Sequence, residues 1–182
     1  MTGAADKVLV ERTLRGERSA FGELVDKYQK VVYNVAYRVL GNTEDAEDVA
    51  QTVFLKVYEN ISTYNPRYQF FSWLYRIAVN EAVNAKKRLR NTVELMEDAV
   101  ATSDTPHDGV EAGDVENQIG AAMMSLSPES RAILILRHYQ EFSYRDIAYI
   151  MDLTEETVKS RLYSARQRLG KILIQKGLKS EL

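Results

Sequence analysis

The chain has 182 residues, of which 45% are hydrophobic, and this is enough for the cores of one or two small domains. It contains no cysteine, which excludes disulfides, thiolate zinc sites and cysteine nucleophiles. No apolar run approaches the roughly 18 residues of a membrane span, and no basic-then-apolar segment opens the chain. We therefore expect a cytoplasmic, soluble protein without direct membrane insertion.

The formal net charge of −2 hides a segregation of charge along the chain. Residues 66–90 carry six basic side chains and one acidic, and residues 119–182 carry ten basic and seven acidic. Between them, residues 91–118 carry eight acidic side chains and no Lys or Arg. Two basic blocks separated by an acidic one indicate two surfaces for nucleic acid on one chain.

The N-terminal half reads as a series of helices. Apolar residues recur at helical spacing over 19–40, and Gly41 with Asn42 ends this stretch. We expect Thr43 to cap a further helix that runs to about Ile61, with acids in its first turns, where the helix dipole favours them. A charged first turn explains these acids better than a metal site, because neither a His nor a Gly-rich turn accompanies them.

The first basic block consists of a polar loop over 62–70 and a helix over about 71–89. One face of this helix carries four polar side chains spaced by three or four residues: Arg76, Asn80, Asn84 and Lys87. Asn can pair with base edges and the cations with phosphates, while nearby aromatic rings could stack on unpaired bases. Core packing is the favoured interpretation for Phe71 and Trp73. For the loop residues Tyr64 and Tyr68, packing and stacking are about equally favoured.

Residues 91–118 contain Ser, Thr, Asp, Gly and Pro and few large apolar side chains. Loops longer than about 12–15 residues are rare inside a compact domain. We therefore expect a flexible acidic linker here, between one helical domain over 1–90 and a second over 119–182. In the second domain, Ser127 followed by Pro128 predicts the start of a helix.

Residues 143–169 predict a helix-turn-helix, whose second, basic helix would enter the DNA major groove. Ser143 and Asp146 have the spacing of a capping box at the start of the first helix. Asp152 lies in the turn, in a place where Gly is common and a left-handed backbone would be slightly strained for Asp. Thr154 can then cap the second helix.

A helical wheel divides the second helix into a core stripe and a polar face. The stripe contains Val158, Leu162, Ala165 and Leu169. The rest of the surface carries short polar groups with cations at both edges, and its candidate DNA-binding residues are Thr157, Lys159, Ser160, Arg161, Tyr163, Ser164, Arg166 and Arg168. This distribution suits base edges and phosphates, although a plain amphipathic surface helix would share its polarity.

Several segments together resemble the extracytoplasmic-function (group IV) sigma factors of bacterial RNA polymerase. The segments are AFGELVDKY at 20–28, DAEDVAQTVFLKVY at 45–58, FSWLYRIAVN at 71–80, LSPESRAILILRHYQEFSYRDIAYIMD at 126–152 and TVKSRLYSAR at 157–166. Their order and spacing make the resemblance specific. It implies an all-α protein with two small helical domains, the C-terminal one containing the helix-turn-helix.

The resemblance also implies roles for these parts. The domain over 1–90 would bind core polymerase and the −10 promoter element, and the domain over 119–182 would read the −35 element as duplex. Docking on the polymerase β′ clamp helices would use Asp45, Asp48, Gln51, Phe54 and Leu55. The −10 element would be read by Tyr64, Arg67, Tyr68, Arg76, Asn80, Asn84 and Lys87. The acidic linker would run through the polymerase active-site channel.

We therefore expect a stress-responsive sigma factor that directs promoter-specific initiation and assists strand opening, with no catalytic residue, cofactor, metal or small-molecule substrate. Its partners would be promoter DNA and core RNA polymerase, which it would contact at the β′ clamp helices and the β flap. The resemblance also allows for an anti-sigma factor as a partner. The alternative is a stand-alone helix-turn-helix regulator with a helical sensing or dimerisation domain, against which the second basic helix and the linker argue. An enzyme with helical domains is a third class, but we find no nucleophile–base arrangement.

Overall fold

The structure is a computed structural model that describes residues 2–97 and 115–176, with side chains over 4–89 and 118–176. Within these ranges the chain is helical and contains no strand, which confirms the expected all-α class. Its elements are α1 (Thr2–Leu14), α2 (Arg18–Leu40), α3 (Thr43–Asn60), a 3₁₀ turn (Ile61–Thr63), α4 (Phe70–Glu97), α5 (Val115–Met124), α6 (Pro128–His138), α7 (Tyr144–Met151) and α8 (Glu155–Gln175).

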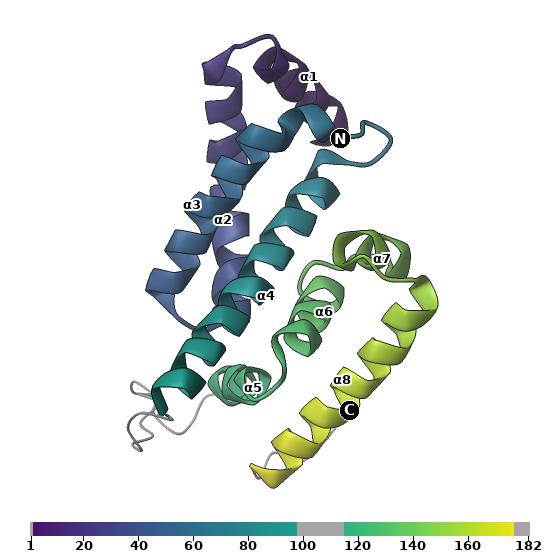
Figure 1. Cartoon of the computed structure of the whole chain (residues 1–182). Helices are drawn as coiled ribbons and strands as arrows, with labels where there is room; N and C mark the ends of the chain where they lie inside the picture. The colour runs from purple at the N-terminus through teal and green to yellow at the C-terminus, as the bar shows by residue number, and fades with distance from the viewer. Residues whose placement is uncertain (1, 98–114, 177–182) are drawn as a thin grey trace.

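The first four helices form an N-terminal unit in which α2, α3 and α4 pack on one another along their lengths (Figure 1). Each contributes an apolar stripe at helical spacing, and the most buried members include Leu24, Val35, Val53 and Leu74. Burial of these stripes, rather than helix propensity alone, holds helices of this length together in water.

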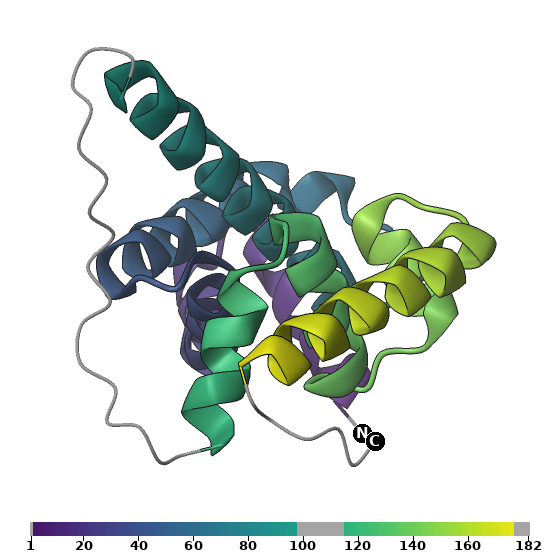
Figure 2. The ribbon, with the colours of Figure 1, turned by 90° about the horizontal axis from the view of Figure 1, so that it is seen from below.

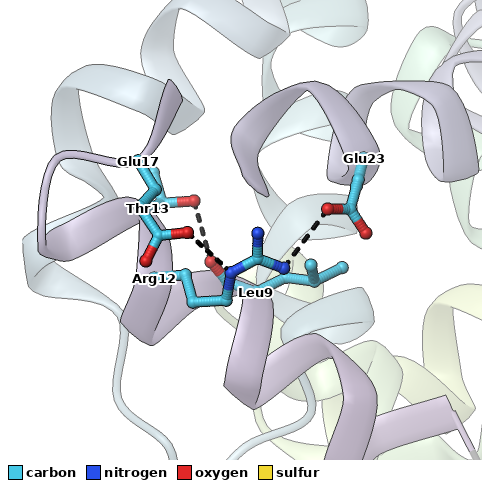
Figure 3. Close-up of polar contacts among 5 residues, drawn as sticks. All are labelled: Leu9, Arg12, Thr13, Glu17 and Glu23. Carbon is cyan, nitrogen blue, oxygen red and sulfur yellow. Dashed lines mark hydrogen bonds and ion pairs between the residues drawn. The ribbon is translucent and has the colours of Figure 1, made fainter. Parts of the chain in front are cut away.

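The short helix α1 packs on α2 and makes one buried group of polar contacts and one at the surface. Asp6 is buried and accepts a hydrogen bond from the Tyr28 hydroxyl at 2.6 Å, with Lys27 beside it as an ion-pair partner. Burial and the neighbouring Asp6 carboxylate raise the pKa of Tyr28. At the surface, the Arg12 guanidinium points between two carboxylates, 2.8 Å from Glu17 and 3.3 Å from Glu23 (Figure 3).

Helices α5 to α8 form a C-terminal unit around α6, which buries Ile133, Ile135 and Leu136. Helix α8 packs on α5, α6 and α7 and lies on the side of α6 away from α4 (Figure 1). Seen from below, α8 runs along the outside of the molecule (Figure 2). The apolar stripe that the helical wheel predicts is buried at Val158, Leu162 and Ala165. Its last member, Leu169, is half-buried.

The two units pack directly against each other through α6 and α7 on one side and α2 and α4 on the other. Their buried apolar residues form one continuous cluster. Phe142, between α6 and α7, contacts the rings of Phe71 and Tyr75 in α4, with centroid distances of 5.6 and 5.1 Å. The sequence predicts two cores joined by a linker and does not reveal this contact between them.

The predicted helix starts in the C-terminal unit are confirmed. Ser127 accepts a hydrogen bond from the Ser130 backbone, and Ser143 with Asp146 forms a full capping box. Thr154 caps α8, and its side chain accepts from the backbone N–H of Thr157. These motifs depend on residues only three positions apart, which is why local sequence predicts them well.

Two predicted boundaries are wrong. Asn42, not Thr43, caps α3, because its extended backbone lies outside the helix and its side chain accepts from the Asp45 N–H at 3.0 Å. The linker expected over 91–118 is too long at both ends, since α4 continues to Glu97 and α5 begins at Val115. Residues 94–97 are Glu-Leu-Met-Glu, all good helix formers, with no Gly or Pro to stop the helix. The rest of the expected linker lies outside the described residues.

Candidate polymerase and nucleic-acid interfaces

A groove of about 1170 Å³ lies between α2 and α3 on the surface of the N-terminal unit. Its floor is apolar and includes Phe21, Phe54, Leu55 and Tyr58, of which Leu55 is 65% and Tyr58 47% exposed. Charged side chains from both helices line the same groove: Arg18, Asp26, Lys30 and Glu47. Exposed large apolar side chains gathered in a charged setting are typical of a surface that binds another protein.

Three of the five residues predicted to bind polymerase line this groove, namely Gln51, Phe54 and Leu55. The other two lie outside its lining: Asp48 is exposed about one turn before Gln51, and Asp45 is half-buried nearer the start of α3. The candidate docking surface therefore has an apolar part in the groove and an acidic part at the N-terminal end of α3.

The polar face of α4 is divided by its contacts with the C-terminal unit. Its middle residues, Asn80 and Asn84, are exposed. The residues at the two ends of this polar face both have a partner in the C-terminal unit. Arg76 donates to the Tyr149 carbonyl at 2.8 Å and lies 3.2 Å from the Asp152 carboxylate, while Lys87 lies 2.6 Å from the carboxylate of Glu129.

The loop before α4 holds one ring inside and one outside. Tyr64 is buried against Phe70 and Trp73, and its hydroxyl donates to the Tyr68 carbonyl at 2.7 Å. Tyr64 therefore shapes the loop and offers little surface to DNA, which corrects its expected role as a reader. Tyr68 is 43% exposed, and its ring stacks on that of Tyr149.

The other aromatic and basic residues around this loop fall as follows. Core packing is confirmed for Trp73, which is buried, and for Phe71, whose ring packs against those of Tyr28, Tyr75 and Phe142. Arg67 is exposed, and its backbone N–H donates to the Asn65 side chain at 3.0 Å. This local hydrogen bond shapes the turn that carries the Arg67 side chain outward.

On α8, seven of the eight predicted DNA-binding side chains are exposed: Lys159, Ser160, Arg161, Tyr163, Ser164, Arg166 and Arg168. The eighth, Thr157, is half-buried, and its hydroxyl lies 2.8 Å from that of Thr154. Arg166 donates from Nε to Nε2 of His138 at 3.2 Å. Burial, with the positive charges of Arg166 and Arg137, lowers the pKa of His138, so the neutral imidazole is the form that accepts this hydrogen bond.

Arg131 is a structural residue that the sequence reasoning missed. It is 2% exposed, and its guanidinium donates to the backbone carbonyls of Met123, Met124, Leu126 and Val39. The first three lie in the C-terminal unit, whereas Val39 lies in the last turn of α2. Burial lowers the pKa of Arg131 to about 10. The only signal in the sequence is its place directly before the apolar run AILIL.

The turn after α2 is a second place where the units meet. Gly41 has φ +77°, and a Cβ at this position would lie 2.6 Å from the sulfur of Met124. Lys86 donates to the Leu40 carbonyl at 2.8 Å, so this cation and Arg131 both satisfy carbonyls at the C-terminal end of α2. Cations there are also favoured by the helix dipole.

A second apolar groove, of about 620 Å³, lies between α5, α6 and α8. Its lining includes Ile119, Met123, Leu173 and Ile174, with His138, Arg166 and Lys171 as basic members. Over 2–97 and 115–176, no helix is long and apolar enough to cross a membrane. Among the same residues, no group of His, Asp and Glu is arranged to hold a metal ion.

Two family models match the chain: Sigma-70 region 2 over residues 24–92 and Sigma-70 region 4 over residues 116–169. The chain is 35% identical to the ECF RNA polymerase sigma-E factor of Haemophilus influenzae, covering 90% of this chain and 93% of that protein. It is 33% identical to the RNA polymerase sigma-H factor of Pseudomonas aeruginosa, covering 95% and 96%. The chain therefore belongs to the ECF family of RNA polymerase sigma factors and directs promoter-specific transcription.

A solved structure of similar fold is the sigma factor RpoE of Bartonella quintana in complex with the anti-sigma factor NepR. It has a TM-score of 0.67 and 25% identity, and the match covers 84% of this chain and 96% of that one. The structure of CnrH in complex with the cytosolic domain of CnrY has a TM-score of 0.68 at 24% identity and covers 94% and 98%. The second likeness supports the fold alone.

Proposed function

We propose that this sigma factor divides its work between its two helical units. The N-terminal unit, α1 to α4, binds core polymerase and the −10 element, and the C-terminal unit, α5 to α8, binds the −35 element. The protein acts in the cytoplasm and has no catalytic activity of its own. The observation that carries this proposal is the presence of two helix faces with exposed polar side chains of the types that can pair with bases, one on α4 and one on α8, in separate units.

Polymerase docking is assigned to α3 and its groove. Leu55 and Tyr58 leave apolar surface in water that a partner helix would cover, which supplies the favourable free energy of binding. Asp45 and Asp48 add negative charge at one end and favour a basic partner such as the β′ clamp helices. The groove between α5, α6 and α8 is our candidate for the β flap, because it offers a second apolar surface on the other unit.

The −35 element is assigned to α8. Ser160 and Ser164 are short, exposed and placed between cations, so they can approach base edges in the major groove. Lys159, Arg161 and Arg168 extend from the edges of the same face, where phosphates would lie. This is the docking geometry of a helix-turn-helix, whose second helix enters the groove.

The −10 element and strand opening are assigned to the loop before α4 and the polar face of this helix. Tyr68 offers a ring on which an unpaired base can stack, and Asn80 and Asn84 are exposed and can pair with base edges. Arg76 and Lys87 add positive charge for the backbone of the strand, and Arg67 extends it into the loop. We also propose an anti-sigma factor as a partner, since the solved relative RpoE binds one.

The test of this assignment is docking on polymerase. Replacing Asp48 with Arg and Gln51 with Ala should abolish co-purification with core polymerase and run-off transcription, while circular dichroism stays unchanged. A matched control is Glu59→Arg, a reversal of charge at an exposed position of α3 outside the groove lining. Unchanged co-purification of the Asp48 and Gln51 double variant would contradict the docking surface.

A further inference from the structure

We propose that the C-terminal end of α7 occupies the −10 site in the free protein as an intramolecular mimic of a nucleotide. The ring of Tyr149 takes the place of a base, and the carboxylate of Asp152 takes the place of a phosphate. In the free sigma factor, the −10 site then cannot bind DNA until the two units separate. This inference rests on the proposed function, because it concerns the same −10 site.

The base-like contact is the stacking of Tyr149 on Tyr68. The two ring centroids are 4.1 Å apart, and the ring planes differ by 14°. This near-parallel arrangement is the geometry in which single-stranded bases stack on aromatic side chains. The other ring pairs of this region are more inclined, from 29° for Phe71 and Phe142 to 82° for Tyr64 and Phe70. The ring of Tyr149 therefore covers the face of Tyr68 that a base would use.

The phosphate-like contact is made on Arg76. One guanidinium nitrogen donates to the Tyr149 carbonyl at 2.8 Å, and the other lies 3.2 Å from the Asp152 carboxylate. Oxygens at the negative end of α7, reinforced by a carboxylate, give the guanidinium a bidentate anionic partner of the kind that a phosphate supplies. The Asp152 side chain is 81% exposed, so core packing does not explain its position.

The backbone conformation of Asp152 also supports this inference. It has φ 56° and ψ 52°, in the left-handed region that Gly occupies without strain. The chain carries a carboxylate at this C-cap in place of the residue that would relax the turn. Asp adopts this region more readily than most residues do, and its carboxylate there makes the contact with Arg76.

The closed arrangement is incompatible with promoter binding at both elements. Elements centred about 25 base pairs apart are separated by about 85 Å of DNA, at about 3.4 Å per base pair. Helix α8 begins three residues after Asp152, which touches α4, and its 21 residues are only about 32 Å long. The units must therefore part, and the 17 residues between α4 and α5 could reach about 60 Å if extended.

A buried hydroxyl supports an interface that opens. Tyr75 is 1% exposed at the contact between the units, beside Phe71 and Phe142. Its hydroxyl has no hydrogen-bond partner among the described residues. Permanent interfaces pair nearly all their buried polar groups, because an unpaired one destabilises the contact. The hydroxyl regains water when the units separate.

The test is binding of free protein to a fluorescein-labelled ten-nucleotide single strand of mixed sequence, measured by fluorescence anisotropy. Asp152→Asn removes the charge and keeps a side chain that tolerates the left-handed backbone. Tyr149→Ala removes the ring. Each should bind the strand about tenfold more tightly than the wild type, because stacking and charge contacts of this size no longer compete with it.

Two matched controls separate the mimic from general effects. Glu156→Gln makes the same change of charge four residues further on, and Tyr149→Phe keeps the ring; both should bind like the wild type. Wild-type affinity in Asp152→Asn and Tyr149→Ala would overturn the mimic. If Arg76→Ala still weakened strand binding and run-off transcription, the −10 site would stand without the mimic. If Arg76→Ala changed neither, the −10 assignment itself would fail.

Discussion

Helices α4 and α8 carry similar polar side chains but differ in what surrounds them. On α8, the cations Lys159, Arg161 and Arg168 are exposed. On α4, Arg76 and Lys87 are paired with carboxylates of the other unit. Residue type and spacing thus predict what a helix face can bind, whereas the neighbouring unit determines whether the face is free to bind it.

The cause of this difference is the position of each helix. Helix α8 packs by one stripe on α5, α6 and α7, which leaves its opposite face in water. Helix α4 packs on α2 and α3 and also on α6 and α7, so it has neighbours on two sides. Arg76 and Lys87 therefore lose their partners only if the two units rearrange, whereas Asn80 and Asn84 are exposed as the chain stands.

Removing Arg131 should have the largest effect on this comparison, because the residue joins the two units. Arg131→Met leaves four backbone carbonyls without their charged donor and should lower the free energy of unfolding by about 3 kcal/mol. Urea denaturation measures this change. Arg137→Met is the matched control: among the described residues its guanidinium makes one hydrogen bond, to the Phe142 carbonyl, and its loss should cost about 1 kcal/mol. Equal losses for the two variants would contradict the joining role.

Single substitutions on α4 and α8, the two helices proposed to read DNA, test the comparison directly. Lys159→Ala should weaken and relax preference within the −35 element, and Asn80→Ala should impair strand opening at the −10 element. A base contact of this kind contributes about 1–3 kcal/mol, or roughly tenfold to a hundredfold in discrimination. Permanganate footprinting and run-off transcription measure both. A pre-melted −10 template should rescue Asn80→Ala but not Lys159→Ala, and the same defect in both variants would refute the division of labour.

A smaller effect is expected from two glycines of α2 and its cap. Gly41→Ala places a Cβ in a left-handed backbone and against the Met124 sulfur at the contact between the units, and should cost about 1–2 kcal/mol. Gly22→Ala lies within the helix, where a Cβ meets nothing within 4 Å, and should stabilise by about 0.5–1 kcal/mol. Thermal unfolding of the two variants should shift in opposite directions, and an unchanged or higher unfolding temperature for Gly41→Ala would contradict the close approach at Gly41.

The smallest effect is expected on the pH dependence of stability. It concerns His138, which lies beside Arg166 of α8. Because the folded pKa of His138 lies below its ordinary value of 6.5, the unfolded chain binds this proton more readily. Its contribution therefore makes the fold less stable as the pH falls below 6.5 toward the folded pKa, and this loss is absent above 6.5. His138→Gln should flatten the change in urea midpoint between pH 7.5 and 5.5. An unchanged pH dependence would show that His138 does not contribute to it.

Much of the architecture follows from local sequence. The capping box at Ser143, the caps at Ser127 and Thr154 and the stripe from Val158 depend on spacings of three or four residues, and the structure confirms them. The role of Tyr64 was beyond such reasoning, because its burial depends on the rings of Phe70 and Trp73 folding back over the loop. The base and polymerase contacts themselves stay predictions.

The sequence by itself determined the all-α class, the helix-turn-helix and the residue types on the polar faces of α4 and α8, since each follows from short-range periodicity and capping. The tertiary structure alone decided that Arg131 joins the units and that Tyr149 and Asp152 cover Arg76. Arg76 and Tyr149 are 73 positions apart, and Arg131 and Val39 are 92 apart. Contacts at these separations depend on how two cores pack, and helical periodicity carries no record of them.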